Sequence, residues 1–180
     1  MTRHKQHSDH SPDQGSGEEV VLHEIDERYM GEAMLVAREA ERAGDLPIGA
    51  IIVKDGVVIA RAGNARSLNG DPTAHAEIIA LREAAEVVGG WRLHGCTLYV
   101  TLEPCTMCAG AIVLARVDRV VYAATDPKAG AVESLYEVLS DERLNHQPDI
   151  RGGVCREEAG EMLTTFFRSK RKNAGTQPKP

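Results

Sequence analysis

Two short segments combine residue types that bind transition metals and move protons. His75 and Glu77 are two residues apart in the first segment, and Cys105 and Cys108 are three residues apart in the second. Both segments lie where we predict helices to begin. The sulfurs of Cys105 and Cys108 therefore share a helix face, where free backbone N–H groups favour thiolate over thiol. Two thiolates are half of a metal site.

An imidazole is the usual partner of two thiolates around zinc, and His75 is the candidate. Three protein ligands leave the fourth tetrahedral position to water, whose pKa zinc lowers toward neutrality. Glu77 is close enough in sequence to reach that water, pass its proton to a ring nitrogen and protonate a leaving amine. This chemistry is hydrolytic deamination, with Glu77 as the catalytic residue and the other three side chains as ligands of Zn²⁺.

The Cys-x-x-Cys pair has two alternative interpretations, half of a structural zinc ribbon or a redox pair of the thioredoxin type. A ribbon needs a second close pair, whereas Cys96 and Cys155 stand alone and are expected to be ordinary buried thiols. The redox interpretation gives no role to His75 or Glu77. We therefore favour the catalytic zinc site.

Alternating strand and helix patterns must position these segments. We predict helices over residues 26–43, 72–88, 104–115 and 157–172, and strands over residues 49–53, 57–60, 97–101 and 119–123. Asp26 is the candidate N-cap of the first helix. A Lys-Asp-Gly turn joins the first two strands into a hairpin, and the later strand–helix–strand units favour parallel neighbours. The sequence predicts an α/β domain with a mixed sheet.

The two ends of the chain differ from this central region. Residues 1–24 and 173–180 are polar without a hydrophobic period, so we expect disordered extensions around one zinc-dependent domain over residues 25–172. The longest apolar run, of about five residues, is too short to span a membrane, and no signal-peptide block is visible. Four cysteines are too few for a disulfide framework. We expect a cytoplasmic protein with no membrane association.

The order His-x-Glu and then Pro-Cys-x-x-Cys resembles the signature of the zinc-dependent cytidine/deoxycytidylate deaminase superfamily. Within it, the chain is most similar to the bacterial tRNA-specific adenosine deaminases. The similarity covers residues 26–172 and includes residues 46–50, 71–77, 98–105, 108–111, 126–130 and 166–168. The resemblance implies a cytidine-deaminase-like, three-layer α/β/α fold with a mixed central sheet of about five strands.

That resemblance also implies deamination of adenosine to inosine at the wobble position of a tRNA anticodon, by a homodimer with one Zn²⁺ ion per subunit. It assigns four residues to substrate binding: Asn64, Ala76, Asp126 and Lys128. Asn64 would hydrogen-bond the flipped nucleotide, and Asp126 and Lys128 would lie beside the RNA backbone. Turn formation alone would also explain Asn64, Asp126 and Lys128.

The net charge of −6 is unfavourable for RNA binding, but the charge is unevenly distributed. Residues 166–180 carry five basic and no acidic side chains. Three of them are candidate contacts to the tRNA anticodon arm: Arg168, Lys170 and Arg171. Phe166 and Phe167 fit an apolar helix face and are expected to be buried. The alternative is a solvated helix end whose cations suit the helix dipole.

Two further functions retain parts of this interpretation. A deaminase of a free nucleobase or nucleoside, such as guanine, cytosine or cytidine, would use the same pocket without a macromolecular surface. A zinc-stabilised interaction module would bind the metal without turnover and would give Glu77 no catalytic role.

Overall fold

The computed structural model describes residues 15–174 of the chain. Its elements, in chain order, are α1 (Gly15–Arg42), β1 (Gly49–Lys54), β2 (Val57–Gly63), α2 (Arg66–Asn69), α3 (Ala76–Val88), β3 (Cys96–Leu102), α4 (Thr106–Ala115), β4 (Arg119–Ala124), the 3-10 helix η1 (Val138–Ser140), β5 (Asp149–Gly152) and α5 (Arg156–Ala174). Our prediction of disorder at the two ends lies outside the described residues for 1–14 and 175–180. None of the helices formed by residues 15–174 has the length and apolar composition needed to cross a membrane.

The strands form one mixed sheet in the order β2-β1-β3-β4-β5. Strand β1 is antiparallel to β2 and β3, whereas β3, β4 and β5 are mutually parallel neighbours. The carboxyl ends of β3 and β4 consequently meet at one edge, and the chain leaves them at Glu103 and Thr125. In open α/β sheets this edge is the usual position of a ligand site.

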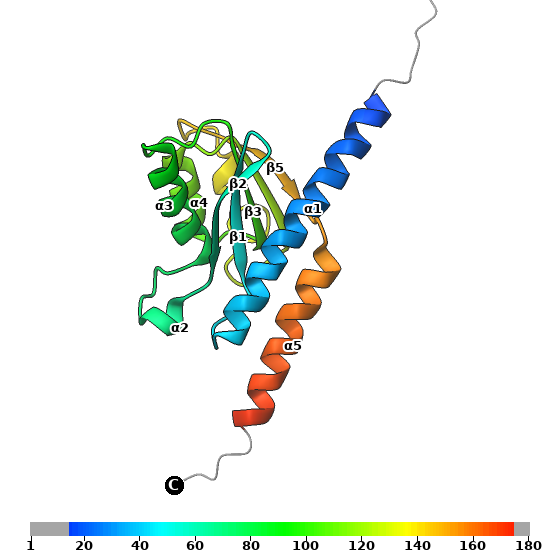
Figure 1. The fold of residues 1–180 in the computed structure, drawn as a ribbon, viewed down its shortest axis with the longest axis vertical. Helices are drawn as coiled ribbons and strands as arrows, with labels where there is room; N and C mark the ends of the chain where they lie inside the picture. Colours follow the sequence, from blue (N-terminus) through cyan, green and yellow to red (C-terminus); the bar gives the residue numbers. More distant parts are fainter. Residues whose placement is uncertain (1–14, 175–180) are drawn as a thin grey trace, which may run out of the picture.

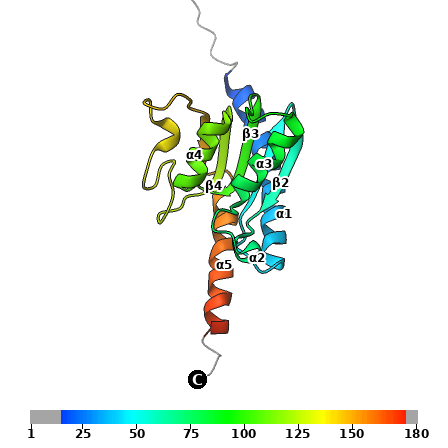
Figure 2. The ribbon, with the colours of Figure 1, turned by 90° about the vertical axis from the view of Figure 1, so that its left-hand side faces the viewer.

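Helices cover both faces of the sheet, which confirms the predicted three-layer α/β/α fold. Helices α3 and α4 lie on one face and α1 and α5 on the other (Figures 1 and 2). Strand β1 is buried on both sides, with alternate residues in two cores. Ala50 and Ile52 belong to the core beneath α3 and α4, and Ile51 and Val53 belong to the core beneath α1.

Small residues let α1 approach β1 closely. A Cβ atom added at Gly49 would overlap the backbone of Ala33 and Ala37. The side chains of Ala33 and Ala37 are themselves fully buried. Glycine at the first position of β1 therefore allows the helix to lie directly against the start of this strand.

The structure corrects the start of the first helix. Helix α1 begins at Gly15 rather than near Asp26, so residues 15–24, which we expected to be disordered, are helical. Asp26 is not an N-cap; its side chain is fully buried and paired with Arg119 and Arg151. Adding turns to a helix already anchored by packing costs little, because nucleation has been achieved.

Other boundaries shift by a few residues. Helix α3 begins at Ala76 instead of residue 72, and α4 begins at Thr106 instead of residue 104, so the candidate ligands stand at the helix starts. Strand β5 was not predicted, because its four residues contain one apolar side chain, Ile150, and carry no alternating pattern. Pairing with β4 defines that strand.

Candidate active site

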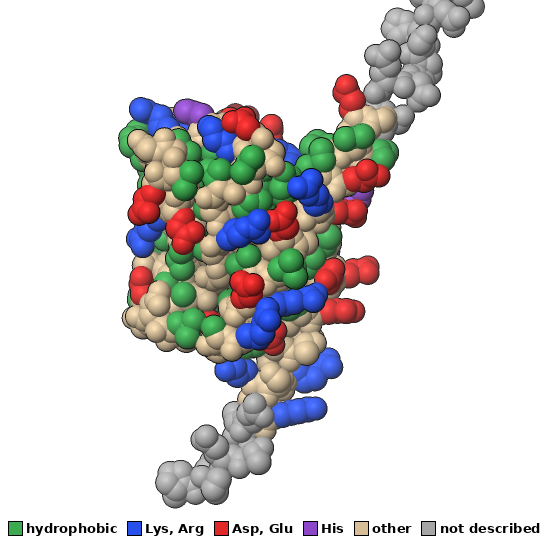
Figure 3. All heavy atoms as spheres, viewed as in Figure 1, with side chains coloured by type: hydrophobic (Ala, Val, Ile, Leu, Met, Phe, Trp, Pro, Cys, Tyr) green, Lys and Arg blue, Asp and Glu red, His purple; other side chains and the backbone are tan. Residues whose placement is uncertain are grey.

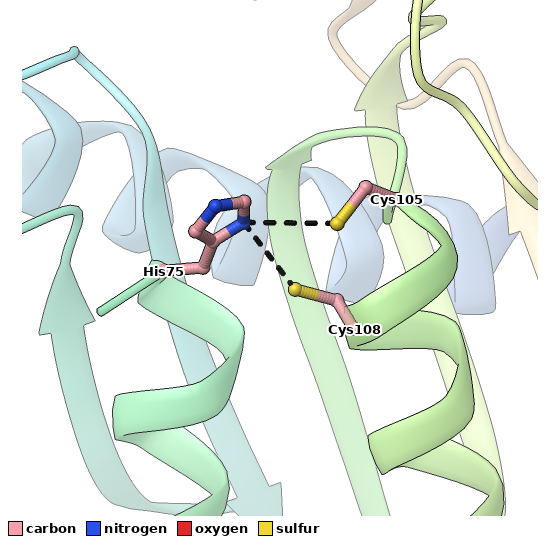
Figure 4. Close-up of side chains that lie close together, drawn as sticks. All are labelled: His75, Cys105 and Cys108. Atoms are coloured by element: carbon pink, nitrogen blue, oxygen red, sulfur yellow. Dashed lines mark hydrogen bonds between the residues drawn. The ribbon is translucent and has the colours of Figure 1, made fainter. Parts of the chain in front are cut away.

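The candidate active site lies where α3 and α4 begin. His75 is the N-cap residue of α3 and Cys105 that of α4, both with extended backbone, and Cys108 lies in the first turn of α4. The close-up shows the imidazole and both sulfurs pointing toward one another from the two helix starts (Figure 4). Both N-terminal ends favour negative charge between them, which suits thiolate ligands.

The separations of these three side chains fit a metal ion. Nδ1 of His75 is 3.7 Å from Sγ of Cys105 and 3.5 Å from Sγ of Cys108, and the donor atoms all lie within 4.8 Å of one another. Tetrahedral zinc with ordinary Zn–N and Zn–S bond lengths separates nitrogen and sulfur ligands by about 3.6 Å. The three donor atoms are soft or borderline, as zinc prefers, and a tetrahedral ion held by them would have a fourth position for a non-protein ligand.

The charge states of these groups follow from their mutual hydrogen bonds and burial. The Cys108 thiol and His75 lower the pKa of Cys105 to about 3, so this sulfur is a thiolate, the form that binds metals. The hydrogen bond to Cys105 raises the pKa of His75. Burial raises the pKa of Glu77, whose side chain is only 4% exposed.

These residues form the base of a pocket of about 490 Å³, a volume typical of small-molecule sites. His75, Glu77 and Cys105 line it together with apolar side chains. These come from the segment before β1, the end of β3 and helix α5: Leu46, Ile48, Leu102, Leu163 and Phe167. Polar and charged side chains line the pocket beside these apolar ones, a mixture that suits a nucleobase removed from its stack. Glu77 is thus a buried carboxyl beside three metal-type donors, within a pocket that has room for a nucleobase.

Comparison with known proteins decides the family. A family model described as MafB19-like deaminase matches residues 24–171. The tRNA-specific adenosine deaminase of Bacillus subtilis (strain 168) is 52% identical over 147 residues, which cover 82% of this chain and 91% of that protein. The corresponding protein of Agrobacterium fabrum (strain C58 / ATCC 33970) is 52% identical over 144 residues, which cover 79% and 94%. The chain belongs to the tRNA-specific adenosine deaminase family.

Solved structures agree with this membership. A structure from a study of A-to-I editing by tRNA:A34 deaminases at the wobble position is 49% identical, with a TM-score of 0.73 and coverage of 76% of this chain and 99% of that chain. A guanine deaminase from Bacillus subtilis is 39% identical, with a TM-score of 0.54 and coverage of 61% and 80%. This chain shares its fold with both proteins. Its sequence identity and its TM-score are both higher for the tRNA:A34 deaminase structure than for the guanine deaminase.

Of the four residues that the resemblance assigns to substrate binding, two line the pocket and two do not. Asp126 and Lys128 line the pocket. Among the described residues, Asn64 and Ala76 do not line it. Asn64 is buried and donates through Nδ2 to Oδ1 of Asp45 at 2.7 Å, and Ala76 is fully buried in the core beneath α3. Their roles toward a substrate stay predictions.

The C-terminal helix α5 presents two different faces. Thr164, Phe167, Lys170 and Arg171 line a groove together with Lys128, next to the pocket. Arg168 lines another groove, formed by the start and middle of the same helix. Phe166 is buried, as predicted, but the prediction for Phe167 was wrong. It is 48% exposed because it lies on the pocket face of α5, one turn beyond Leu163.

Three polar residues near the site were not recognised from the sequence as site residues. Arg66, the first residue of α2, lines the pocket, and no sequence pattern marks it. Asp45 is buried and accepts hydrogen bonds from Asn64 and from the backbone N–H groups of Leu46, Ser67 and Leu68. Glu103 is buried and accepts hydrogen bonds from backbone N–H groups of a loop more than twenty residues further along the chain. An acidic residue directly before a metal-ligand motif was the available signal.

Proposed function

We propose that this protein deaminates adenosine to inosine at the wobble position of a tRNA anticodon, with one zinc ion per subunit. The observation that carries the proposal is the convergence of His75, Cys105 and Cys108 beside the buried carboxyl of Glu77. The relatives named above indicate the substrate, because they are tRNA-specific adenosine deaminases. His75, Cys105 and Cys108 would hold the zinc ion.

Glu77 would carry the protons of the reaction. Zinc bound at these ligands supplies water that is activated at neutral pH. Glu77 takes a proton from this water and delivers it to N1 of the purine as the water oxygen bonds to C6. Glu77 would then move the proton of the new C6 hydroxyl to the amino group; the C6–N6 bond breaks, ammonia leaves and inosine remains. Burial of Glu77 keeps competing bulk water away from this proton path.

The anticodon arm would lie along the groove that continues from the pocket. Lys128, Lys170 and Arg171 line that groove and supply cations for RNA phosphates. Lys and Arg side chains surround the C-terminal part of α5, in contrast to the net negative charge of the whole chain (Figure 3). Phe167 offers an exposed ring on which a neighbouring base can stack.

We also propose a cytoplasmic homodimer. Helix α4 has apolar residues on every side, and its Leu114 is 71% exposed in the described chain. Helices that are apolar all round are typical of buried positions, which supports α4 as part of the contact between subunits. Leu114→Glu should shift the protein toward monomer in sedimentation experiments; a wild type that is already monomeric would contradict the dimer.

The test of function compares substrates. Purified zinc-loaded protein is incubated with a tRNA carrying adenosine at the wobble position, with the same tRNA carrying guanosine there, and with free guanine, cytosine and cytidine. We expect inosine at the wobble position by sequencing and no ammonia from the other substrates. Ammonia from a free base, with the wobble adenosine unchanged, would contradict the proposal.

A guanine deaminase is the second candidate, favoured by the 39% identity to such an enzyme of known structure. It would use the same pocket but gain nothing from the groove cations. The two candidates separate in the substrate panel, because guanine turnover without tRNA turnover supports only the second. The groove beside the pocket, lined by Lys128, Lys170 and Arg171, is the reason to prefer tRNA.

A further inference from the structure

Glu103 is a buried carboxylate that receives an unusual number of hydrogen bonds from one loop. It lies two residues before Cys105 and is 2% exposed. Oε1 accepts the backbone N–H groups of Val132, Glu133 and Ser134 at 3.0, 2.8 and 2.9 Å. Oε2 accepts the N–H of Asp126 at 2.9 Å and the hydroxyl of Ser134. All five donors come from residues 126–134, which we call the Glu103 loop.

The Glu103 loop carries four residues of the pocket, two of them with charged side chains. Asp126 and Lys128 line the pocket, and Lys128 also lines the adjoining groove. Within the loop, Oδ1 of Asp126 accepts the N–H groups of Lys128 and Ala129, so the placement of Asp126 sets that of Lys128. The far part of the loop is attached where Ala131 donates to the carbonyl of Pro104 at 2.8 Å.

Gly130 completes this arrangement. A Cβ atom at this position would overlap the carboxylate of Glu103 and approach the carbonyl oxygen of Asp126. The loop can therefore close over Glu103 only with glycine there. Glu103 and Gly130 thus act together: the carboxylate binds the loop, and the glycine leaves space for the loop to wrap around it beside the metal ligands.

We propose that Glu103 is a positioning residue, which holds the Glu103 loop so that Asp126 and Lys128 stay in place to bind the RNA substrate. The inference rests on the proposed function for the identity of that substrate. Glu103 does not touch the reacting atoms in this account. It acts through the loop, so its loss should weaken substrate binding more than the chemical step.

Glu103→Gln tests the role with a small change in shape. An amide oxygen in the place of Oε1 still accepts from Val132, Glu133 and Ser134, whereas an amide nitrogen in the place of Oε2 faces the N–H of Asp126. Two donors then oppose each other, and the Asp126 end of the loop is released. Gly130→Ala should release the same end by a different route, through overlap with the carboxylate.

The experiment measures tRNA kinetics, zinc content and amide hydrogen exchange for wild type, Glu103→Gln and Gly130→Ala. For both variants we expect KM for tRNA to rise about tenfold, the effect of losing roughly one charged hydrogen bond, with kcat changed less than about twofold. The Asp126 amide should exchange at least about tenfold faster in Glu103→Gln, with zinc content unchanged.

Asp26→Asn is the matched control, because Asp26 is another buried carboxyl but pairs with Arg119 and Arg151. It should lower the melting temperature and leave KM unchanged. If Glu103→Gln behaves like this control, or loses zinc together with activity, the proposal is overturned. An inactive wild type would contradict the proposed function; the exchange measurement then decides the inference, and an unchanged Asp126 amide would reject it.

Discussion

His75, Cys105 and Cys108 meet because each stands at the start of a helix, not because they are close in the chain. The extended N-cap conformation of His75 and Cys105 directs both side chains across the gap between α3 and α4. Nδ1 of His75 then lies 3.5 Å from the sulfur of Cys108. Ligand geometry is thus a consequence of two helix boundaries.

Replacing one ligand should remove the metal. For Cys108→Ser, we expect zinc per subunit to fall from about one to near zero, since a neutral serine hydroxyl is a poor zinc ligand. Metal analysis of the purified protein measures this. Cys96→Ser is the control, because Cys96 is also buried but lies outside the three-residue cluster. Full zinc content in Cys108→Ser would show that the ion is bound elsewhere.

Individual site residues could be predicted from the sequence where the residue type itself restricts the possible chemistry. The types and spacing of His75, Cys105 and Cys108 predicted the three-residue cluster that the structure contains, and Glu77 lines the same pocket. The buried roles of Asp45 and Glu103 could not be predicted. Their partners are backbone N–H groups of distant loops, which every residue type except proline possesses, so no side-chain pattern reports them.

Helix α5 shows how one element supports both the fold and the site. Phe166 is buried, and Lys170 lies over its ring at 5.3 Å. Phe167 and Arg171 turn toward the pocket and its groove. The predicted amphipathic pattern was right for the helix as a whole but assigned Phe167 to the core, because adjacent aromatic residues cannot both face one side of a helix.

Two neighbouring cations of α5 should therefore differ in effect. Arg171→Ala should raise KM for tRNA about fivefold and reduce the salt dependence of binding by the equivalent of about one phosphate contact. Arg168→Ala should change both by less than about twofold, since Arg168 lines a different groove. Titrating tRNA at several salt concentrations measures both effects. Equal effects of the two substitutions would place the RNA on another face.

Strands and helices with a strong hydrophobic pattern were predicted. A strand that exists because it pairs with a neighbour, and turns that extend a helix packed further along the chain, were not. β1 carries a continuous apolar run, β3 has three apolar residues between two threonines, and α3 ends at a glycine in left-handed conformation. β5 exists through its parallel pairing with β4. The first turns of α1 continue a helix that is packed further along. Neither cause is local in sequence.

The whole molecule is held together on the α1 side by one buried ion-pair network. Asp26 of α1 accepts two hydrogen bonds of 2.7 Å from Arg119 of β4 and one of 2.9 Å from Tyr99 of β3. Arg151 of β5 adds an ion pair at 3.1 Å. One carboxylate thereby ties α1 to three parallel strands, including the short edge strand.

Removing this carboxylate should destabilise the entire fold. Asp26→Asn should lower the free energy of unfolding by about 3 kcal/mol at pH 7, because it removes a fully buried carboxylate and leaves two partly buried arginines without their counter-ion. Burial alone would raise the pKa of Asp26, but the hydrogen bonds from Arg119 and Tyr99 outweigh it and lower the pKa.

The pH dependence of this difference follows from the direction of the shift. A carboxyl group with a lower pKa in the folded state stabilises the fold above its unfolded pKa of about 3.9 and loses that effect as pH falls. Denaturation of wild type and Asp26→Asn should therefore differ fully at pH 7 and progressively less below about pH 4. A difference that grows toward acid would refute the assignment.

The most direct test of the central claim is single-turnover deamination of a tRNA with a wobble adenosine by wild type and Glu77→Gln at equal zinc content. We predict inosine formation by the wild type and a rate at least about 100-fold lower in the variant, since the amide cannot shuttle protons. Unchanged adenosine with the wild type, or comparable rates for the two proteins, would contradict the account.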